Sequence, residues 1–284
     1  MSGSAPNLST VLDRNREHLF RLAIIASVAE TDIDDLFTRT LEGDYEDEAP
    51  WEAVQALRRL GTRLVFDKAA KGAESAEPLV RARGIDVLAQ LRKTVGDPTN
   101  SFPEESYAVV TNALQQETEL QPLNSAISAL GHLYDSRAVP LIAAFRSHPD
   151  AEIRFSVACA LGSFPNDALS VETLLTLTED ADDNVREWAT FGVGVLGDED
   201  SAEIRDSLYR RLNDSNEDVR EEALIGLAKR HDTRSLPTLI DALQQPAISR
   251  RVVEAAYTLL GMDDDQKDWS GQDYANALRQ RFGG

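Results

Sequence analysis

One short pattern occurs three times in this chain at nearly equal intervals. It reads AEIRFSVACALG, DNVREWATFGVG and EDVREEALIGLA, beginning at residues 151, 183 and 217. The arginines of the three copies, Arg154, Arg186 and Arg220, lie 32 and 34 residues apart. A spacing in this range is typical of repeat architectures, and it constrains the fold more than any other feature of the sequence.

The same frame extends over most of the chain when the arginine is allowed to vary. Its seven origins are Ala53, Arg81, Leu123, Arg154, Arg186, Arg220 and Val253. Three residues after an origin the chain carries mostly Gly or Ala, seven residues after it Leu or Val, and eight residues after it always Gly or Ala. Small and aliphatic residues at these offsets predict a helix that packs closely against its neighbours.

A second helical pattern lies between successive copies. In SAEIRDSLYRRL, Ile204, Leu208 and Leu212 recur every four residues and mark one apolar stripe. Pro140 and Pro237 begin other helices of this kind, because a helix tolerates proline in its first turn. Each repeat is therefore predicted to be an antiparallel helix pair. Such pairs stack to bury their faces, so we expect an all-α, right-handed α-solenoid of about seven repeats with helical caps.

The predicted organisation is one domain over residues 1–284. Residues 1–8 are expected to be flexible, 13–49 to form N-terminal cap helices, 50–261 the repeats, and 262–284 a C-terminal cap. Cap helices are expected around Asp13–Glu30 and Asp273–Phe282. Loops are expected at Asp44–Ala49 and, within the repeats, at Arg92–Glu105.

The charge of the chain narrows the choice of partner. The sequence has 29 Lys and Arg against 49 Asp and Glu, a formal net charge of −20. Such a chain repels phosphate backbones and anionic lipid, so we expect neither nucleic acid nor a membrane as partner, but a protein with a basic surface. The expected oligomeric state is a monomer.

The one cysteine, Cys159, lies in an apolar run, and no apolar leader begins the chain, so a cytoplasmic location is expected.

The stretch Gly192–Gly197 reads GVGVLG and fits the G-x-G-x-x-G spelling of dinucleotide-binding proteins. Those glycines bind a pyrophosphate only when they follow a strand and open a helix. Here Gly192 and Gly194 fall six and eight residues after the origin Arg186, in columns that other repeats also fill with small residues. We therefore expect them to serve helix packing, with Gly197 ending the segment.

The sequence carries no recognisable catalytic, cofactor or metal site. The four histidines, His18, His132, His148 and His231, form no H-E-x-x-H motif and no close pair. Neither a G-x-S-x-G motif nor a P-loop occurs. No catalytic residue, no cofactor and no metal is therefore predicted.

The repeated arginines have two interpretations. Arg154, Arg186 and Arg220 each follow Asp150, Asp182 or Asn216 by four residues. The row could bind an anionic ligand, or the Asp and Asn residues could cap helices while the arginines form a ladder of charge-assisted hydrogen bonds between adjacent repeats. Because the pattern recurs in register, the structural ladder is favoured.

A helical wheel of the second helices predicts a partner-binding surface. The residues one, two, five and nine positions after the origins of repeats four to six fall beside or opposite the core arc. They include Phe155, Glu187, Trp188, Phe191, Glu221, Glu222, Ile225 and Lys229. Aromatics beside acids suit a basic protein, although neighbouring helices could instead cover Phe155 and Trp188.

The D-x-x-V-R and L-G columns, followed by D-x-R-x-x-P-x-L-I, resemble short bacterial HEAT repeats of the kind found in phycobilisome-lyase-like proteins. Residues 184–243 also resemble a small HEAT protein encoded in the Rhs toxin loci of enteric bacteria. The resemblance implies a scaffold that binds a protein without catalysis, with an immunity or antitoxin-like role in which an acidic concave surface masks a basic toxin. The alternative that it implies is a lyase-like protein that handles a chromophore or another small molecule.

Overall fold

The computed structural model describes residues 33–92, 99–265 and 268–283 of this chain. Within these ranges the regular elements are helices, and an isolated bridge between Arg92 and Asn100 is the only β-type pairing. The flexible start predicted at 1–8 and the helix predicted at Asp13–Glu30 lie outside the described residues.

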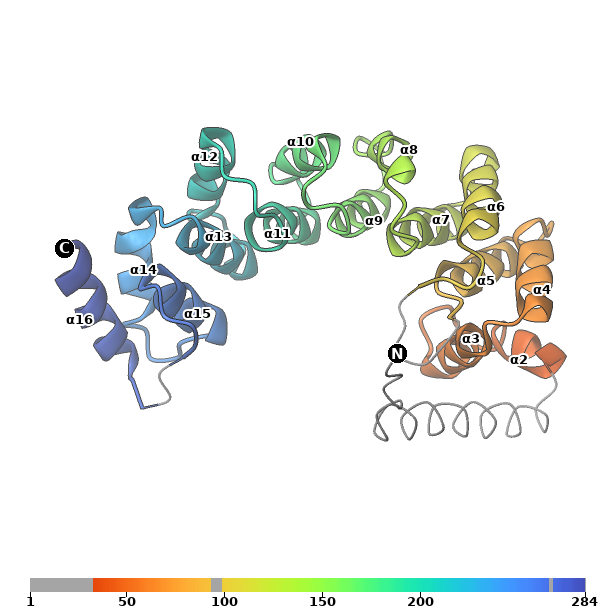
Figure 1. Cartoon of the computed structure of the whole chain (residues 1–284), viewed down its shortest axis with the longest axis horizontal. Helices are drawn as coiled ribbons and strands as arrows, with labels where there is room; N and C mark the ends of the chain where they lie inside the picture. Colours follow the sequence, from red (N-terminus) through yellow and green to blue (C-terminus); the bar gives the residue numbers. More distant parts are fainter. Residues whose placement is uncertain (1–32, 93–98, 266–267, 284) are drawn as a thin grey trace, which may run out of the picture. The chain divides into compact units, whose positions relative to one another are not determined.

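The described helices alternate between first and second members of seven pairs (Figure 1). The first helices are α2 (Ile33–Arg39), α4 (Arg63–Ala73), α6 (Pro103–Gln116), α8 (Val139–Ala143), α10 (Ala168–Leu177), α12 (Ala202–Arg211) and α14 (Leu236–Ala242). The second helices are α3 (Glu48–Leu60), α5 (Pro78–Ala89), α7 (Leu120–His132), α9 (Ala151–Leu161), α11 (Asp183–Phe191), α13 (Glu217–Lys229) and α15 (Arg250–Leu259).

Every origin of the sequence frame lies on a second helix, so the seven helix pairs confirm the predicted all-α solenoid of about seven repeats. The last helix, α16 (Gly271–Phe282), follows the seventh pair and covers the C-terminal helix predicted at Asp273–Phe282. The loop predicted at Asp44–Ala49 lies earlier in the chain than expected, because α2 ends at Arg39 and α3 already begins at Glu48, which leaves residues 40–47 between them.

Contacts divide the chain into two compact units, Met1–Ala129 (unit 1) and Leu130–Gly284 (unit 2). In unit 1, α2 packs on α3, and α5 contacts both α3 and α4. In unit 2, α9, α11, α13 and α15 contact one another in succession and form one layer, while α8, α10 and α12 lie in a second layer (Figure 1). A single domain over 1–284 stays a prediction.

The aliphatic column of the repeats forms the core of each unit. Leu88, Leu161 and Leu227, each seven residues after an origin, are fully buried. The small residues beside them allow helix backbones to approach closely. A Cβ atom added to Gly226 on α13 would lie 2.8 Å from the Cα of Gly194. The Gly and Ala columns are therefore explained by the close approach of neighbouring second helices.

Two first helices begin with proline as expected. Pro140 lies in the first turn of α8 and Pro237 in the first turn of α14. Each follows a short 3-10 turn, Ser136–Ala138 or Thr233–Ser235, which an aspartate side chain caps at its N-terminal end. Proline is accepted there because the first turn does not need its missing backbone N–H.

We expect Gly226→Ala to destabilise unit 2, because the added methyl group overlaps the Gly194 backbone and the Leu208 side chain. Overpacking of this kind costs about 1–3 kcal/mol in the free energy of unfolding, measurable by urea denaturation. The matched control is Gly72→Ala on α4, whose methyl group would meet its neighbours at ordinary distances of 3.5 Å and more. That variant should be stabilised by about 0.5–1 kcal/mol, and equal effects of the two substitutions would contradict the packing argument.

Candidate protein-binding surface

Arg154 and Arg186 each join two neighbouring repeats through one carboxylate. Nε and Nη2 of Arg154 donate to Asp180 at 2.7 and 2.8 Å, and those of Arg186 donate to Asp214 at 2.9 and 2.8 Å. Nη1 of each arginine donates to two backbone carbonyls of the turn before its own helix. Because the guanidinium is planar and rigid, this pattern fixes the position of one turn against the next.

The predicted ladder residues Asp150, Asp182 and Asn216 act on their own helices. Their side chains accept hydrogen bonds from backbone N–H groups in the first turns of α9, α11 and α13. The carboxylates that bind the arginines lie two residues before a cap, at Asp180 and Asp214. Sequence reasoning missed these two residues, although their constant offset from the cap would have located them.

The glycine stretch Gly192–Gly197 is part of the packing between α11 and α13. Residues Gly192–Leu196 form a π-helical turn that continues α11, and Gly197 follows in an extended conformation. The buried guanidinium of Arg230 donates to the carbonyl oxygens of Val193, Gly194 and Gly197 at 2.8, 2.8 and 3.3 Å. A side chain of the same chain thus occupies this backbone, which follows a helix rather than a strand.

Three aromatic side chains form a continuous row on α9 and α11, which we call the aromatic row. The ring centroids of Phe155 and Trp188 are 5.9 Å apart and those of Trp188 and Phe191 are 5.6 Å apart, with both pairs edge to face. Trp188 is 39% exposed, and Phe155 and Phe191 are half-buried. The structure therefore brings these three predicted surface residues together, with their middle member open to solvent.

Three other members of the predicted surface are not exposed. Glu221, Glu222 and Ile225 on α13 are buried, with 8%, 3% and 4% of their surface exposed. The wheel assumed one buried arc, but α13 packs against α11, α12 and α15, so its flanks are also covered. The exposure predicted for these three side chains is wrong. Lys229 is exposed, and its Nζ donates to the carbonyl of Val195.

An acidic cluster surrounds Arg251 of α15, next to the aromatic row. Nη1 of Arg251 lies 2.8 Å from Asp218, its Nε lies 3.1 Å from Glu222, and its Nη2 lies 3.9 Å from Glu187. Burial, together with the charges of Glu187, Glu221 and Glu254, raises the pKa of Glu222 to about 7 against the opposing effect of Arg251. One cation thus faces several carboxylates, and a second cation placed beside them would be stabilised.

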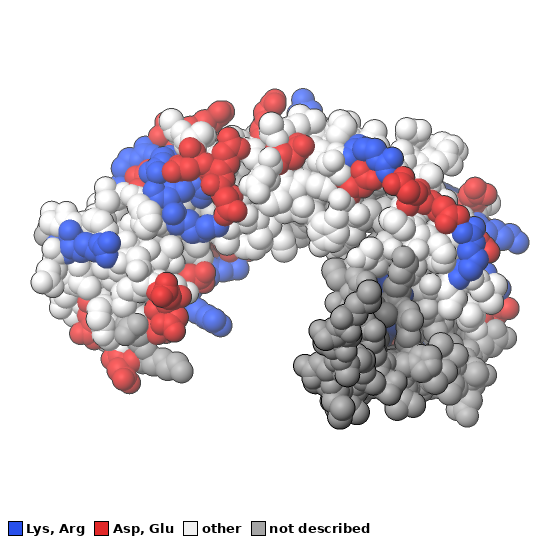
Figure 2. Space-filling view, viewed as in Figure 1, with Lys and Arg blue, Asp and Glu red and all other residues white. Residues whose placement is uncertain are grey.

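Several charges on the layer of first helices form ion pairs with one another. Figure 2 shows Lys and Arg side chains gathered beside Asp and Glu over α12. Arg210 and Arg211 both bind Glu179, and Arg234 binds Asp206 at 2.7 Å. Beside the aromatic row, by contrast, Glu187, Asp218 and Glu222 share the single cation Arg251.

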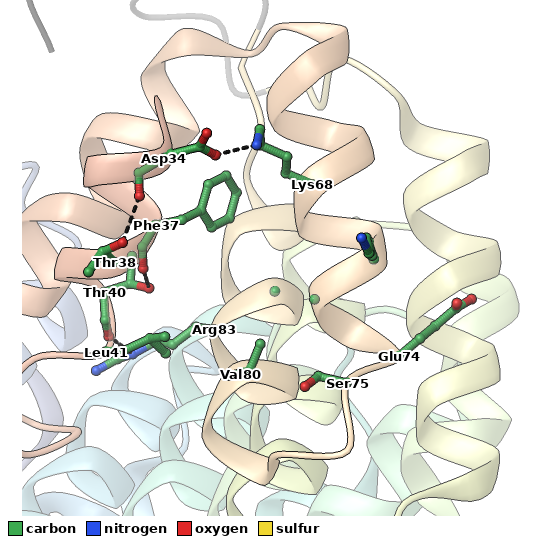
Figure 3. Close-up of a pocket in the computed structure, with 13 residues that line it drawn as sticks. Asp34, Phe37, Thr38, Thr40, Leu41, Lys68, Glu74, Ser75, Val80 and Arg83 are labelled. Carbon is green, nitrogen blue, oxygen red and sulfur yellow. Dashed lines mark hydrogen bonds and ion pairs between the residues drawn. The ribbon is translucent and has the colours of Figure 1, made fainter. Parts of the chain in front are cut away.

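Unit 1 has a cavity of about 650 Å³ between α2, α4 and α5 (Figure 3). Phe37 and Val80 line it, and the ion pair between Lys68 and Asp34 lies at one end. Arg83 also lines the cavity, but its guanidinium donates to two backbone carbonyls. The volume is in the range of small-molecule sites, while the lining described here offers no nucleophile paired with a base.

A buried polar network lies close to this cavity. The hydroxyl of Tyr45 donates to Asp86 at 2.8 Å, Nε of Arg58 donates to the Asp86 backbone carbonyl, and Nη1 of Arg83 is 3.6 Å from the Asp86 carboxylate. Burial raises the pKa of Asp86 and that of Tyr45. Shifted pKa values can mark functional sites, but these charges face one another and join α3 to α5.

The chemistry of the described residues is limited in other respects. No group of three His, Cys, Asp or Glu side chains in 33–92, 99–265 and 268–283 is arranged to hold a metal ion. Burial raises the pKa of the Cys159 thiol to about 12, so this group is not a thiolate at neutral pH. Among the described helices, none has the length and apolar character needed to cross a membrane.

Comparison with protein families identifies the repeat. A model of HEAT repeats matches residues 107–194 and 171–261, which together make up more than half of the chain. Protein YibA of Escherichia coli (strain K12) is 38% identical over 104 residues, which are 37% of this chain and 36% of YibA. The aligned part therefore spans about a third of the length of that relative.

Two further similarities concern a lyase subunit and a solved structure. The phycocyanobilin lyase subunit alpha of Thermosynechococcus vestitus is 29% identical over 100 residues, 35% of this chain and 36% of that protein. The X-ray structure of Escherichia coli YibA superposes with a TM-score of 0.69 at 19% identity, covering 99% of this chain and all of that one. At this identity the structural similarity concerns the fold alone.

We expect Arg186→Ala to lower the free energy of unfolding by about 3 kcal/mol at neutral pH, because it leaves the buried Asp214 carboxylate without its main partner. Burial raises the pKa of Asp214, but its hydrogen bonds and the nearby arginines hold that pKa below the usual 3.8. The stabilisation is therefore complete at neutral pH and is lost as the pH falls through the lowered pKa. The difference between wild type and variant should narrow in that acidic range.

The control for this substitution is Arg210→Ala. The Arg210 side chain is 55% exposed and pairs with an exposed glutamate. Its loss should change the free energy of unfolding by less than about 1 kcal/mol, measured by urea denaturation. Equal losses in the two variants would show that Arg186 does not hold the repeats together.

Glu222→Gln is expected to stabilise the protein at alkaline pH. The pKa of Glu222 is about 7 in the folded chain and 4.5 ordinarily, so ionisation opposes folding above pH 7, and the effect disappears below pH 4.5. The gain in the free energy of unfolding should be on the order of 1–3 kcal/mol at about pH 8 and close to zero at about pH 4. Glu172→Gln, at an exposed position on α10, is the control and should change little at either pH. A loss of stability at pH 8 would disprove the assignment.

Proposed function

Because the chain belongs to the HEAT-repeat family, we propose that it is a non-catalytic binding protein that engages a basic protein through the second-helix layer of unit 2. Solenoids of stacked helix pairs offer extended surfaces of this kind. The binding surface consists of the aromatic row together with the carboxylates of Glu187 and Asp218, whose side chains are 23% and 55% exposed.

The observation that carries this proposal is the exposed Trp188 between two further aromatic rings, directly beside Glu187. An exposed tryptophan supported edge to face by Phe155 and Phe191 is a rigid apolar anchor, and such anchors supply much of the binding energy of protein interfaces. The carboxylates beside it attract a basic partner and increase the rate of association. Glu187 and Trp188 are neighbouring residues of α11, so one partner can contact both.

The specific form of the proposal is an immunity or antitoxin-like role. In this role the acidic surface covers the basic active surface of a toxin, such as a nuclease, and excludes its nucleic acid. The net charge of −20 supports this form because it favours association with a basic protein and disfavours direct binding of nucleic acid.

The second candidate is a lyase-like role with a chromophore or another small molecule. Its support is the similarity to a phycocyanobilin lyase subunit and the 650 Å³ cavity of unit 1.

The test mixes the purified full-length chain with any basic domain that the adjacent genes encode. We expect a complex whose dissociation constant increases at least about tenfold between low and high salt. Trp188→Ala should weaken it by about 30-fold, equivalent to about 2 kcal/mol, because the anchor is lost. Isothermal titration calorimetry measures both effects, and circular dichroism checks that helicity is retained.

The matched control is Tyr209→Ala on α12, which truncates an aromatic side chain of similar exposure that packs on Arg234. Its affinity should equal that of the wild type. If Trp188→Ala binds the basic partner with unchanged affinity, the proposed binding surface is wrong. If no basic neighbour binds, and the purified chain retains a visible chromophore, the small-molecule role replaces the binding role.

A further inference from the structure

The residue two positions before each second-helix cap follows a rule along the chain. Where the origin of the preceding repeat is arginine, this position holds a carboxylate that binds it. The pairs are Arg81 with Glu117, Arg154 with Asp180, and Arg186 with Asp214. Where the preceding origin is Ala53 or Leu123, the position holds Ser75 or His148, and these side chains only accept the backbone N–H of the next cap.

Arg220 is the exception to this rule among the described repeats. Its Nη1 donates to the carbonyl oxygens of Asp214 and Ser215 at 2.8 and 3.0 Å, as in the other ladder arginines. The cap of the next second helix is Ser249, and two residues before it stands Ala247, which has no polar atom in its side chain. The guanidinium is therefore held in the ladder orientation, while none of the residues in 33–92, 99–265 and 268–283 places a carboxylate on its Nε and Nη2.

A cavity of about 280 Å³ lies at the position of the missing carboxylate. Arg220, Ala247 and Ser249 all line it, together with residues of α14. In the preceding repeat the same place is filled by Asp214, which binds Arg186 and also accepts the backbone N–H of the cap at 3.0 Å. Because the side chain of Ala247 is short, the Nε and Nη2 donors of Arg220, which we call the Arg220 fork, face an open cavity instead of a carboxylate.

We propose that the Arg220 fork and this cavity bind a carboxylate presented by another molecule, in the place that Asp214 takes in the repeat before. This site is independent of the aromatic row and of the proposed function, because it uses a different arginine and a ligand of opposite charge. Glu221, which was predicted from the sequence to lie on the partner-binding surface, lines this cavity instead.

The acids around the cavity define the ligand more narrowly. Glu217 and Asp241 also line the cavity, so a phosphate dianion or a run of acids would be repelled. In the preceding repeat Asp214 binds Arg186 and Arg211, at 2.8 and 3.2 Å, although Asp183, at the position equivalent to Glu217, lies 2.6 Å from Arg186. Because Arg220 is, among the described residues, the single basic side chain that lines the cavity, it can hold no more than one carboxylate. The ligand is therefore a lone carboxylate, as on one Asp or Glu side chain with neutral or basic neighbours.

The experiment follows the Nε–Hε resonances of Arg220 and Arg186 by ¹⁵N NMR in the full-length chain. Sodium acetate and a short capped peptide with one glutamate are titrated against sodium chloride of equal ionic strength. We expect a saturable shift of the Arg220 resonance and no shift of Arg186, whose fork is already filled. Saturation by acetate assigns the site to any carboxylate, and saturation by the peptide alone assigns it to a carboxylate carried on a chain.

Ala247→Asp restores the missing carboxylate and serves as the blocking variant. It should move the Arg220 resonance toward that of Arg186 without added ligand and abolish the response to both probes. It should also raise the melting temperature by a few degrees, about 2–4 °C, as one added charged hydrogen-bond pair would. A shift of Arg220 that follows chloride equally, no shift with either probe, or an unchanged response in Ala247→Asp would overturn the proposal.

Discussion

The bidentate hydrogen bonds between an arginine of one repeat and a carboxylate before the next determine how the helix pairs of unit 2 stack. Arg154 and Arg186 each bind the turn before their own helix with one nitrogen and the following repeat with the other two. Since the guanidinium is rigid, the spacing and register of successive second helices are set together. The Gly and Ala columns then allow the backbones to meet at that spacing.

The same stacking explains why polar groups on the second helices have unusual environments. A helix between two neighbours and its own partner is covered on three sides, so Glu222 is almost fully buried although it lies among other acids. Its pKa is raised to about 7 because burial and like charges both disfavour ionisation. Trp188 lies on the remaining open side of α11 and is exposed. The proposed binding surface thus follows from which side the stacking leaves uncovered.

The arginines of unit 2 have several different roles. Arg186 joins repeats through a carboxylate, and Arg230 satisfies the carbonyls of the π-helical turn that a cofactor motif would leave open. Arg251 partly neutralises the acidic cluster, and Arg220 keeps an unfilled fork. The similarity to HEAT-repeat proteins concerns the scaffold on which these arginines lie.

The fold was predictable because helix-pair repeats depend on local periodicity, which the columns at Leu161, Leu227 and Gly226 display directly. Caps at Asp150 and Asp182 were predictable for the same reason. The exposure of Glu221 and Ile225 was not, because a wheel describes one helix and cannot include its neighbours. The carboxylate partner of Arg186, and the cavity beside Arg220, were also decided by the tertiary structure. Whether a fork meets Asp214 or an open cavity depends on residues about 30 positions away, which only stacking brings together.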